Sequence, residues 1–228
     1  MKFLTVKNSA EKAELLIYGD IVDDSWNWGW EDDPNVYPKD IKNMLNGFDG
    51  KDVDVHINSG GGHVFAGMAI SNMLKAYNGK TTAYIDGLAA SAASIIAFGC
   101  KEVVIPSNAF LMIHKPSGEA FGNSDEMLKA AEMLDVIQKS AVATYLSKAK
   151  EGITEKQIDD MVNAETWLLG AEATEFFNVQ IADEVGAVNC VGDFSHYHNT
   201  PKQLMQKPKN EQNQNEKMKQ AIEIALAI

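Results

Sequence analysis

The chain has 228 residues, with 20 Lys and Arg against 32 Asp and Glu, so its formal net charge is −12. Hydrophobic residues make up 45% of it, which excludes a disordered or fibrous protein and predicts a globular one. The acidic balance argues against nucleic acid as a partner, because phosphates are neutralised by clustered Lys and Arg. This length predicts one sizeable domain with a short appendage.

The cysteines and the apolar runs indicate a cytoplasmic protein. Cys100 and Cys190 are too few for a disulfide scaffold, which favours a reducing compartment. Residues 1–12 hold no long apolar stretch, so we expect no signal peptide. The longest apolar-rich run, residues 87–99, is well short of the roughly 20 residues that span a bilayer. We therefore expect no membrane partner.

Strands and helices are predicted to alternate along the chain. Apolar runs predict strands over residues 3–6, 15–18, 53–57, 81–85, 103–105 and 110–113. Helical spacing predicts helices over residues 37–48, 64–77, 91–98 and 171–177. A long helix is predicted from an N-cap at Ser124 to about Lys150, with an apolar stripe wide enough to contact more than one surface. A shorter helix should follow an N-cap at Thr154, and residues 179–188 should close the fold as an edge strand. This alternation predicts an α/β fold.

The composition changes near residue 190. Residues 191–228 are rich in Asn, Gln, Lys and Pro and poor in large apolar side chains, which is typical of a polar linker or tail. Met218, Ile222 and Leu226 regain helical spacing near the end, which is compatible with a short docking helix or a frayed remnant. We therefore predict a folded domain over residues 1–190 and a tail over residues 191–228.

A glycine cluster follows the third predicted strand. Asn58-Ser59-Gly60-Gly61-Gly62 precedes a helix, and consecutive glycines let backbone N–H groups converge on an anion. A flexible turn is the simpler interpretation of such a run. The cluster matches neither of the glycine motifs that bind nucleotides.

A serine and a histidine follow strands in positions that suit catalysis. Ser91, in the segment GLAAS, precedes an apolar helix whose N-terminus would favour negative charge on a reacting oxygen. A closely packed buried helix explains the small residues equally well, and Ser94 is an equal candidate on this motif alone. His114 ends an apolar strand before a proline, where it could act as a general base or be structural.

Together these segments resemble the Clp protease proteolytic subunit family. NSGGG at 58–62, GLAAS at 87–91 and MIH at 112–114 follow the order of the family motifs N-S-P-G-G, G-x-A-A-S and M-I-H. The resemblance extends from about Leu15 to Val188. It implies a ClpP/crotonase-type α/β fold with repeated strand-strand-helix units. The activity that it implies is that of a serine endopeptidase with no cofactor.

The resemblance also implies roles for individual residues. Ser91, and not Ser94, matches the nucleophile, and His114 matches the base. The oxyanion hole would come from the N–H groups of Gly62 and Ala92.

Substrate binding is implied at two places. Gly61 and His63 flank the oxyanion glycine and would line the substrate groove. A peptide substrate would add as a strand beside Gly118, Ala120 and Gly122.

The third member of the triad departs from the family pattern. Alignment on Glu172-Ala173 places Glu165 where the family has an aspartate. A glutamate can orient an imidazole, but because its side chain is longer, its backbone must lie further from the histidine. Asp159 and Asp160 are the nearest alternatives, although each also fits a solvated helix face.

Other departures indicate a subtype. Gly60 replaces the family proline, and residues 26–33 hold three of the four tryptophans, unlike the unfoldase-coupled enzymes. The chain is instead similar to the ClpP-like head maturation (prohead) proteases of tailed phages and prophages. This resemblance implies an ATP-independent protease in the cytoplasm of a bacterial host. Its substrates would be capsid or scaffold proteins, and it would form a ring-shaped homo-oligomer through residues 124–150. Packing of a hairpin or a subunit contact also explains the tryptophans.

Two other functions compete with this one. A crotonase-type acyl-CoA enzyme would share an oxyanion hole but lacks a serine nucleophile, and an inactive assembly scaffold would use the fold only to oligomerise. His196 and His198 give too weak a metal-binding pattern, so we expect no metal. Cys100 is expected to be packed and not reactive.

Overall fold

The computed structural model describes residues 4–8, 12–27, 34–183, 194, 197–202 and 204. The chain divides into two compact units, residues 1–193 and 194–228, and the sheet and helices described below belong to the first. The tail helix expected around Met218–Leu226 lies outside the described residues.

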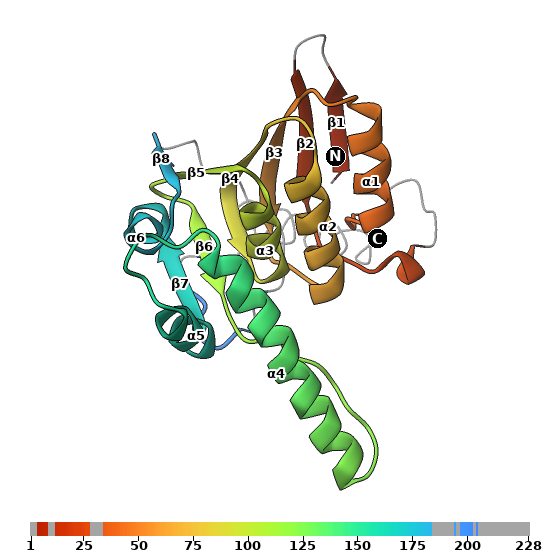
Figure 1. The fold of residues 1–228 in the computed structure, drawn as a ribbon, viewed down its shortest axis with the longest axis vertical. Coiled ribbons are helices and arrows are strands. Elements are labelled where there is room, and N and C mark those ends of the chain that lie inside the picture. The colour runs from red at the N-terminus through yellow and green to blue at the C-terminus, as the bar shows by residue number, and fades with distance from the viewer. Residues whose placement is uncertain are drawn as a thin grey trace, which may run out of the picture. The chain divides into compact units, whose positions relative to one another are not determined.

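An eight-stranded, mostly parallel sheet forms the centre of the first unit (Figure 1). Its strands are β1 (Leu4–Asn8), β2 (Lys12–Tyr18), β3 (Asp52–Ser59), β4 (Thr81–Ala90), β5 (Glu102–Pro106), β6 (Phe110–Ile113), β7 (Thr166–Leu169) and β8 (Gln180–Ala182). The order is β1-β2-β3-β4-β5-β8, with β6 paired to the end of β4 and β7 paired to β6. The β1–β2 and β6–β7 pairs are antiparallel. The predicted α/β fold class is confirmed.

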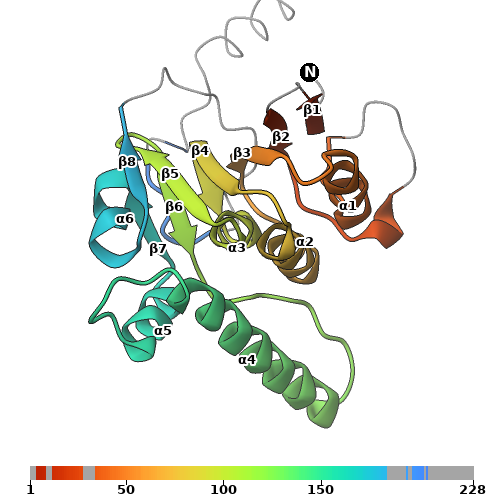
Figure 2. The ribbon, with the colours of Figure 1, turned by 45° about the horizontal axis from the view of Figure 1, so that its top comes forward.

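The helices α1, α2 and α3 lie against one face of this sheet (Figures 1 and 2). The helical elements are η1 (Asp24–Trp26), α1 (Pro38–Gly47), α2 (Val64–Ala76), α3 (Ala92–Gly99), α4 (Ser124–Leu146), α5 (Glu155–Asn163) and α6 (Gly170–Phe176). Side chains alternate along β3, where Val53, Val55 and Ile57 are buried in the core shared with α1, α2 and α3. Parallel strands joined by helical crossovers account for this arrangement.

Small residues bring α2 and α3 into close contact. A Cβ atom added to Gly67 would lie 2.9 Å from the Cβ of Ala92, and one added to Gly99 would lie 2.5 Å from the Ser71 carbonyl oxygen. Neither glycine can therefore be enlarged without displacing the facing helix. All eight residues of α3 are buried, so its N-terminus is held firmly against the sheet.

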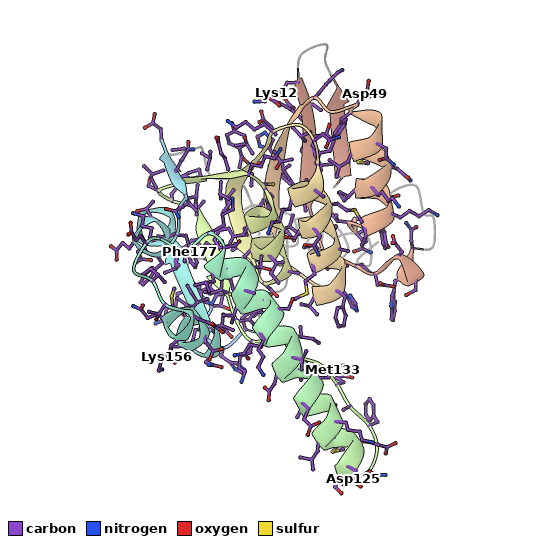
Figure 3. The ribbon with its side chains drawn as sticks, viewed as in Figure 1. Lys12, Asp49, Asp125, Met133, Lys156 and Phe177 are labelled. Atoms are coloured by element: carbon purple, nitrogen blue, oxygen red, sulfur yellow. The ribbon has the colours of Figure 1, made fainter. Side chains whose placement is uncertain are left out.

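The helix α4 extends well beyond the body of the unit. Its first half projects with residues 114–123 running beside it, and Asp125 and Met133 lie on this part (Figures 1 and 3). We call residues 114–136 the arm. Buried residues of α4 lie only in its second half, namely Ile137, Gln138, Ala141, Val142 and Tyr145.

Several predicted boundaries were wrong. Asn123, and not Ser124, caps α4, because its side chain accepts from two N–H groups while Glu126 accepts from the Asn123 N–H. The helix ends at Leu146 instead of Lys150. The fourth strand continues to Ala90 instead of ending at residue 85, because β6 pairs with residues 88–90. The closing strand spans only Gln180–Ala182 of the expected residues 179–188, of which 184–188 lie outside the described part.

Candidate active site

Ser91 occupies a sharp turn between β4 and α3. Its φ is 54° and its ψ is −123°, a region that non-glycine residues seldom adopt and that costs about 1–3 kcal/mol. The turn is held because the Ser91 N–H donates to the Met112 carbonyl at 3.0 Å and the Ser94 N–H donates to the Ser91 carbonyl at 3.0 Å. A strained turn from strand to helix presents a serine hydroxyl outward at a helix N-terminus.

His114 lies beside this serine. The parallel pairing of β4 with β6 sets Ala90 opposite Met112, so the residues that follow each strand meet at the same edge of the sheet. The distance from His114 Nε2 to Ser91 Oγ is 2.7 Å, and both side chains are partly exposed. This distance permits direct proton transfer from the hydroxyl to the imidazole.

Ser94 has a different environment from Ser91. It is completely buried, its hydroxyl donates to the Ser91 carbonyl at 2.6 Å, and it lies 2.9 Å from the Tyr145 hydroxyl. Ser94 therefore stabilises the turn from within the core and is not accessible to a substrate.

The glycine loop passes directly over the N-terminus of α3. A Cβ atom on Gly61 would lie 2.7 Å from Ser91 Cβ and 3.1 Å from the Ala92 nitrogen, and its φ is +101°. Gly62 has a φ of +140°, and an added Cβ would lie 2.1 Å from the Ile21 carbonyl oxygen. Both positions therefore require glycine, both for space and for backbone conformation.

Two N–H groups of this region are available to an anion. The Gly61 N–H donates to Ser59 Oγ, and the His63 N–H donates to the Ile21 carbonyl. Within the described part of the chain, the N–H groups of Gly62 and Ala92 have no protein acceptor. Ala92 is the first residue of α3, where the helix dipole also favours negative charge.

Glu165 is brought to the same edge by the antiparallel pairing of β6 and β7. Ile113 is opposite Thr166, so His114 and Glu165, the next residues outward, face each other across the strands. Glu165 has a φ of 52°. One of its carboxylate oxygens, Oε1, accepts a hydrogen bond from Trp167 Nε1 at 3.3 Å.

The alternative aspartates lie on α5 and have partners on α4 and α5. Asp159 accepts from Gln138 Nε2 at 2.7 Å, and Asp160 forms an ion pair with Lys156 at 2.7 Å. Neither aspartate makes a hydrogen bond to His114. Of the three candidate acids, only Glu165 lies in register with the histidine.

The predicted substrate residues lie in two separate places. Gly61 borders the serine, and His63, two residues further on, caps α2 with its ring 5.9 Å from the half-exposed ring of Phe65. Gly118, Ala120 and Gly122 are exposed in a segment without regular structure that leaves His114 and follows α4 (Figure 1). This segment has no strand partner among the described residues.

Trp167 was not among the site residues predicted from the sequence. Its link to Glu165 could have been anticipated, because residues two apart on a strand point to the same face. The predicted strand pattern did not include β7, so that periodicity was not used.

The thiol of Cys100 is buried, as expected, and this burial raises its pKa to about 12. In the described ranges, no group of three His, Cys, Asp or Glu side chains is placed to hold a metal ion. His196 of the weak metal pattern lies outside those ranges. None of the helices in the part of the chain that the structure describes is both long and apolar enough to cross a membrane.

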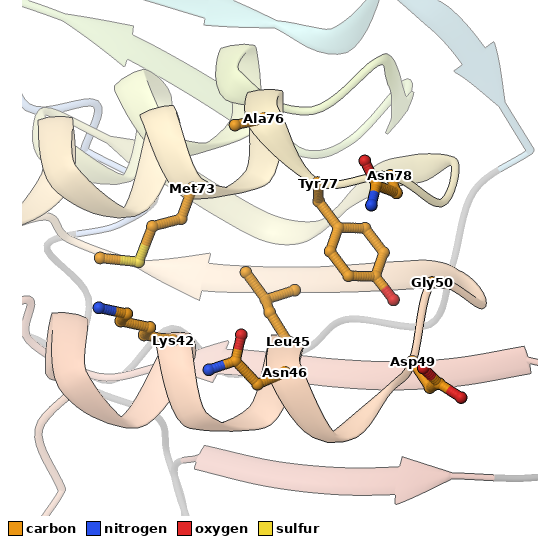
Figure 4. Close-up of a pocket in the computed structure, with 9 residues that line it drawn as sticks. All are labelled: Lys42, Leu45, Asn46, Asp49, Gly50, Met73, Ala76, Tyr77 and Asn78. Atoms are coloured by element: carbon orange, nitrogen blue, oxygen red, sulfur yellow. The ribbon is translucent and has the colours of Figure 1, made fainter.

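A cavity of about 460 Å³ lies between α1 and α2 (Figure 4). Its lining comes from the C-terminal parts of both helices and the turns that follow them, namely Lys42, Leu45, Asn46, Asp49, Gly50, Met73, Ala76, Tyr77 and Asn78. His63 caps the opposite end of α2, about 20 Å away along a 13-residue helix. The cavity therefore contains none of the predicted site residues.

Comparison with known protein families identifies the family of this chain. The family model described as Clp protease matches residues 44–187, more than half of the chain. The chain belongs to the Clp protease family. The matched range contains Ser91, His114 and Glu165.

Individual members of the family are similar to part of this chain. The ATP-dependent Clp protease proteolytic subunit 1 of Chlamydia felis is 36% identical over 126 residues, which are 54% of this chain and 60% of that subunit. The proteolytic subunit of Ligilactobacillus salivarius is 41% identical over 85 residues, 36% of this chain and 43% of that subunit. The chain thus matches at most about 60% of the length of these relatives.

The fold is also that of a solved Clp structure. A ClpP1 mutant from Listeria monocytogenes superposes with a TM-score of 0.58 at 24% identity, covering 75% of this chain and 91% of that one. The ClpP-type fold expected from the sequence is confirmed.

Proposed function

We propose that this Clp-family chain is a serine endopeptidase. The observation that carries the proposal is the 2.7 Å contact between Ser91 Oγ and His114 Nε2 at a strained helix N-terminus. Ser91 Oγ bonds to the substrate carbonyl carbon while its proton passes to His114. The imidazolium then protonates the leaving amine, and water hydrolyses the acyl-enzyme by the same route.

The remaining site residues stabilise this chemistry. The N–H groups of Gly62 and Ala92 hold the oxyanion, which is consistent with their having no protein acceptor. Glu165 orients His114 through Nδ1, since Nε2 is directed at the serine. Gly61 and His63 border the bound peptide, and the open backbone of residues 118–122 pairs with it as an added strand.

The proposed enzyme is a homo-oligomeric ring. On the arm, Met127, Leu128, Met133 and Val136 expose between 50% and 64% of their surface, and Phe121 exposes 88%. A cluster of large apolar side chains on one projecting element is typical of a protein–protein interface. This surface supports the expected subunit contact through residues 124–150.

The proposed biological role is ATP-independent cleavage of capsid or scaffold proteins in a phage or prophage of a bacterial host. The sequence features that favour it are the tryptophan-rich residues 26–33 and Gly60 in place of the family proline. Co-expression of the wild type or Ser91→Ala with the neighbouring capsid gene, followed by mass spectrometry, tests the role. Cleavage only with the wild type is expected, and an uncut capsid protein in both cultures would contradict it.

A fluorophosphonate probe tests the chemistry. We expect labelling of Ser91 in the wild type and in Ser140→Ala, which alters an exposed serine of α4, and none in Ser91→Ala. The absence of labelling in a folded, oligomeric wild type would instead support an inactive scaffold or a crotonase-type acyl-CoA enzyme, neither of which uses a serine nucleophile.

A further inference from the structure

Glu165 stands at a backbone position that usually favours glycine. It follows Ala164, the C-cap of α5, its N–H donates to the Val162 carbonyl at 3.3 Å, and its φ of 52° is left-handed. Helices commonly end with glycine in this conformation, because a Cβ atom costs about 1–2 kcal/mol there. The strained backbone fixes the direction of the Cα–Cβ bond of Glu165. The side-chain torsions beyond Cβ need a further contact to fix them.

Trp167 provides a directional contact to that side chain. Glu165 immediately precedes β7 and Trp167 is its second residue, so the two side chains share one face of the strand. The indole has a single donor, Nε1–H, which lies 3.3 Å from Glu165 Oε1. The indole ring packs edge-on against Phe110 of β6, with centroids 6.5 Å apart at 77°. It is thus held against the strand that His114 directly follows.

We propose that Trp167 is a positioning residue for the peptidase reaction. Its indole N–H holds one oxygen of Glu165, which leaves the other oxygen in a fixed place to orient His114. This arrangement explains how a glutamate can serve where a shorter aspartate would need no such support. The inference rests on the proposed function, because it assigns Glu165 to the triad.

The substitution Trp167→Phe tests this role, since it keeps an aromatic ring against Phe110 but removes the donor. Loss of a hydrogen bond to a carboxylate should lower kcat and the rate of fluorophosphonate labelling about tenfold or more. The KM for a peptide substrate should stay within about twofold, because Trp167 has no role in ground-state binding.

Phe110→Leu is the matched control, because it disturbs the packing of the same indole ring and leaves the N–H in place. We expect its labelling rate to fall less than threefold, at a thermal stability no higher than that of Trp167→Phe. Equal losses of labelling in the two variants would show that Trp167 is merely structural and would overturn the inference.

A double-mutant cycle decides whether Trp167 acts through Glu165. In a Glu165→Ala background, Trp167→Phe should lower the labelling rate no further, whereas a second tenfold loss would refute the inference. A wild type that is not labelled at Ser91 would defeat the proposed function itself. A labelled wild type whose rate equals that of Trp167→Phe would defeat only the inference.

Discussion

Two helices of the same unit, α3 and α4, use apolar residues in opposite ways. All eight residues of α3 are buried, and its first N–H is held beside Ser91 by the contact of Gly61 with Ala92. Of the 23 residues of α4, five are buried, and large apolar side chains of its first half face solvent. Apolar residues therefore pack α3 firmly into the core, whereas in the first half of α4 they form an exposed surface.

We expect this difference to separate the proposed catalytic site from the proposed subunit contact. A nucleophile at a strained turn needs neighbours that cannot move, and α3 provides them through close packing with α2 and the sheet. Among the described residues, the large apolar side chains of the arm are exposed and lack such close packing, so we expect them to contact another copy.

The largest expected effect concerns the site supported by α3. His114→Ala should lower peptidase activity at pH 7.5 by about 10⁴–10⁶-fold, because the serine loses its proton acceptor. Activity of the wild type should also fall on acidification, since a protonated imidazole cannot accept that proton. Peptide cleavage assays across pH measure both effects. Unchanged activity of His114→Ala would refute the assigned base.

Stability should distinguish the two helices sharply. Ile96→Ala in α3 should lower the free energy of unfolding by about 2–5 kcal/mol, because the side chain is fully buried and leaves a cavity. Val136→Ala in α4 removes a side chain that is 64% exposed and should change it by less than about 0.5 kcal/mol. Denaturant titrations of dilute, dissociated protein compare the two variants. Similar losses of unfolding free energy would show that the two helices do not differ in packing.

Association should depend on the arm. Leu128→Glu combined with Met133→Glu should weaken self-association at least about 100-fold, because charges would be buried in the interface. Sedimentation velocity measures the effect, and Lys129→Glu is the control for charge on the same helix. An oligomer that survives the double substitution would show that the arm is not the contact.

A smaller change in stability is expected from relieving the backbone strain at Glu165. Glu165→Gly should raise the free energy of unfolding by about 0.5–1 kcal/mol while greatly lowering activity, because glycine relieves the left-handed conformation. Ala164→Gly, at a φ of −84°, should instead destabilise the protein. A less stable Glu165→Gly variant would show that strain is absent there.

The smallest effect concerns the sheet face opposite the helices. His56 Nδ1 lies 3.0 Å from Asp86 Oδ2, and this hydrogen bond raises the pKa of His56 above 6.5, against the opposing effect of burial. The stabilisation is therefore fully present below about pH 6.5 and is lost as the pH rises through the higher folded pKa.

His56→Gln tests that contribution. It should lower the free energy of unfolding more at pH 5.5 than at pH 8.5, by less than about 1 kcal/mol, because the pair is partly solvated. Denaturant titrations at the two pH values measure the difference. An equal loss at both would exclude a charged pair.

The sequence alone determined the α/β class and predicted the segments to which we assign the chemistry. Periodicity located most strands and helices, and the order of the three motifs indicated the family, because both depend on spacing along the chain. Neither periodicity nor motif order could predict that the apolar side chains of the arm are exposed. A wide apolar stripe predicts contact but does not tell whether the partner is this chain or another.

Tertiary structure decided what depends on contacts between distant residues. Pairing of β4 with β6 brings Ser91 to His114, and pairing of β6 with β7 places Glu165 opposite the histidine. It also placed Ser94 in the core, gave the two aspartates other partners and revealed the bond from Trp167. Register, burial and backbone strain arise from the packed chain as a whole, so no local pattern of residues specifies them.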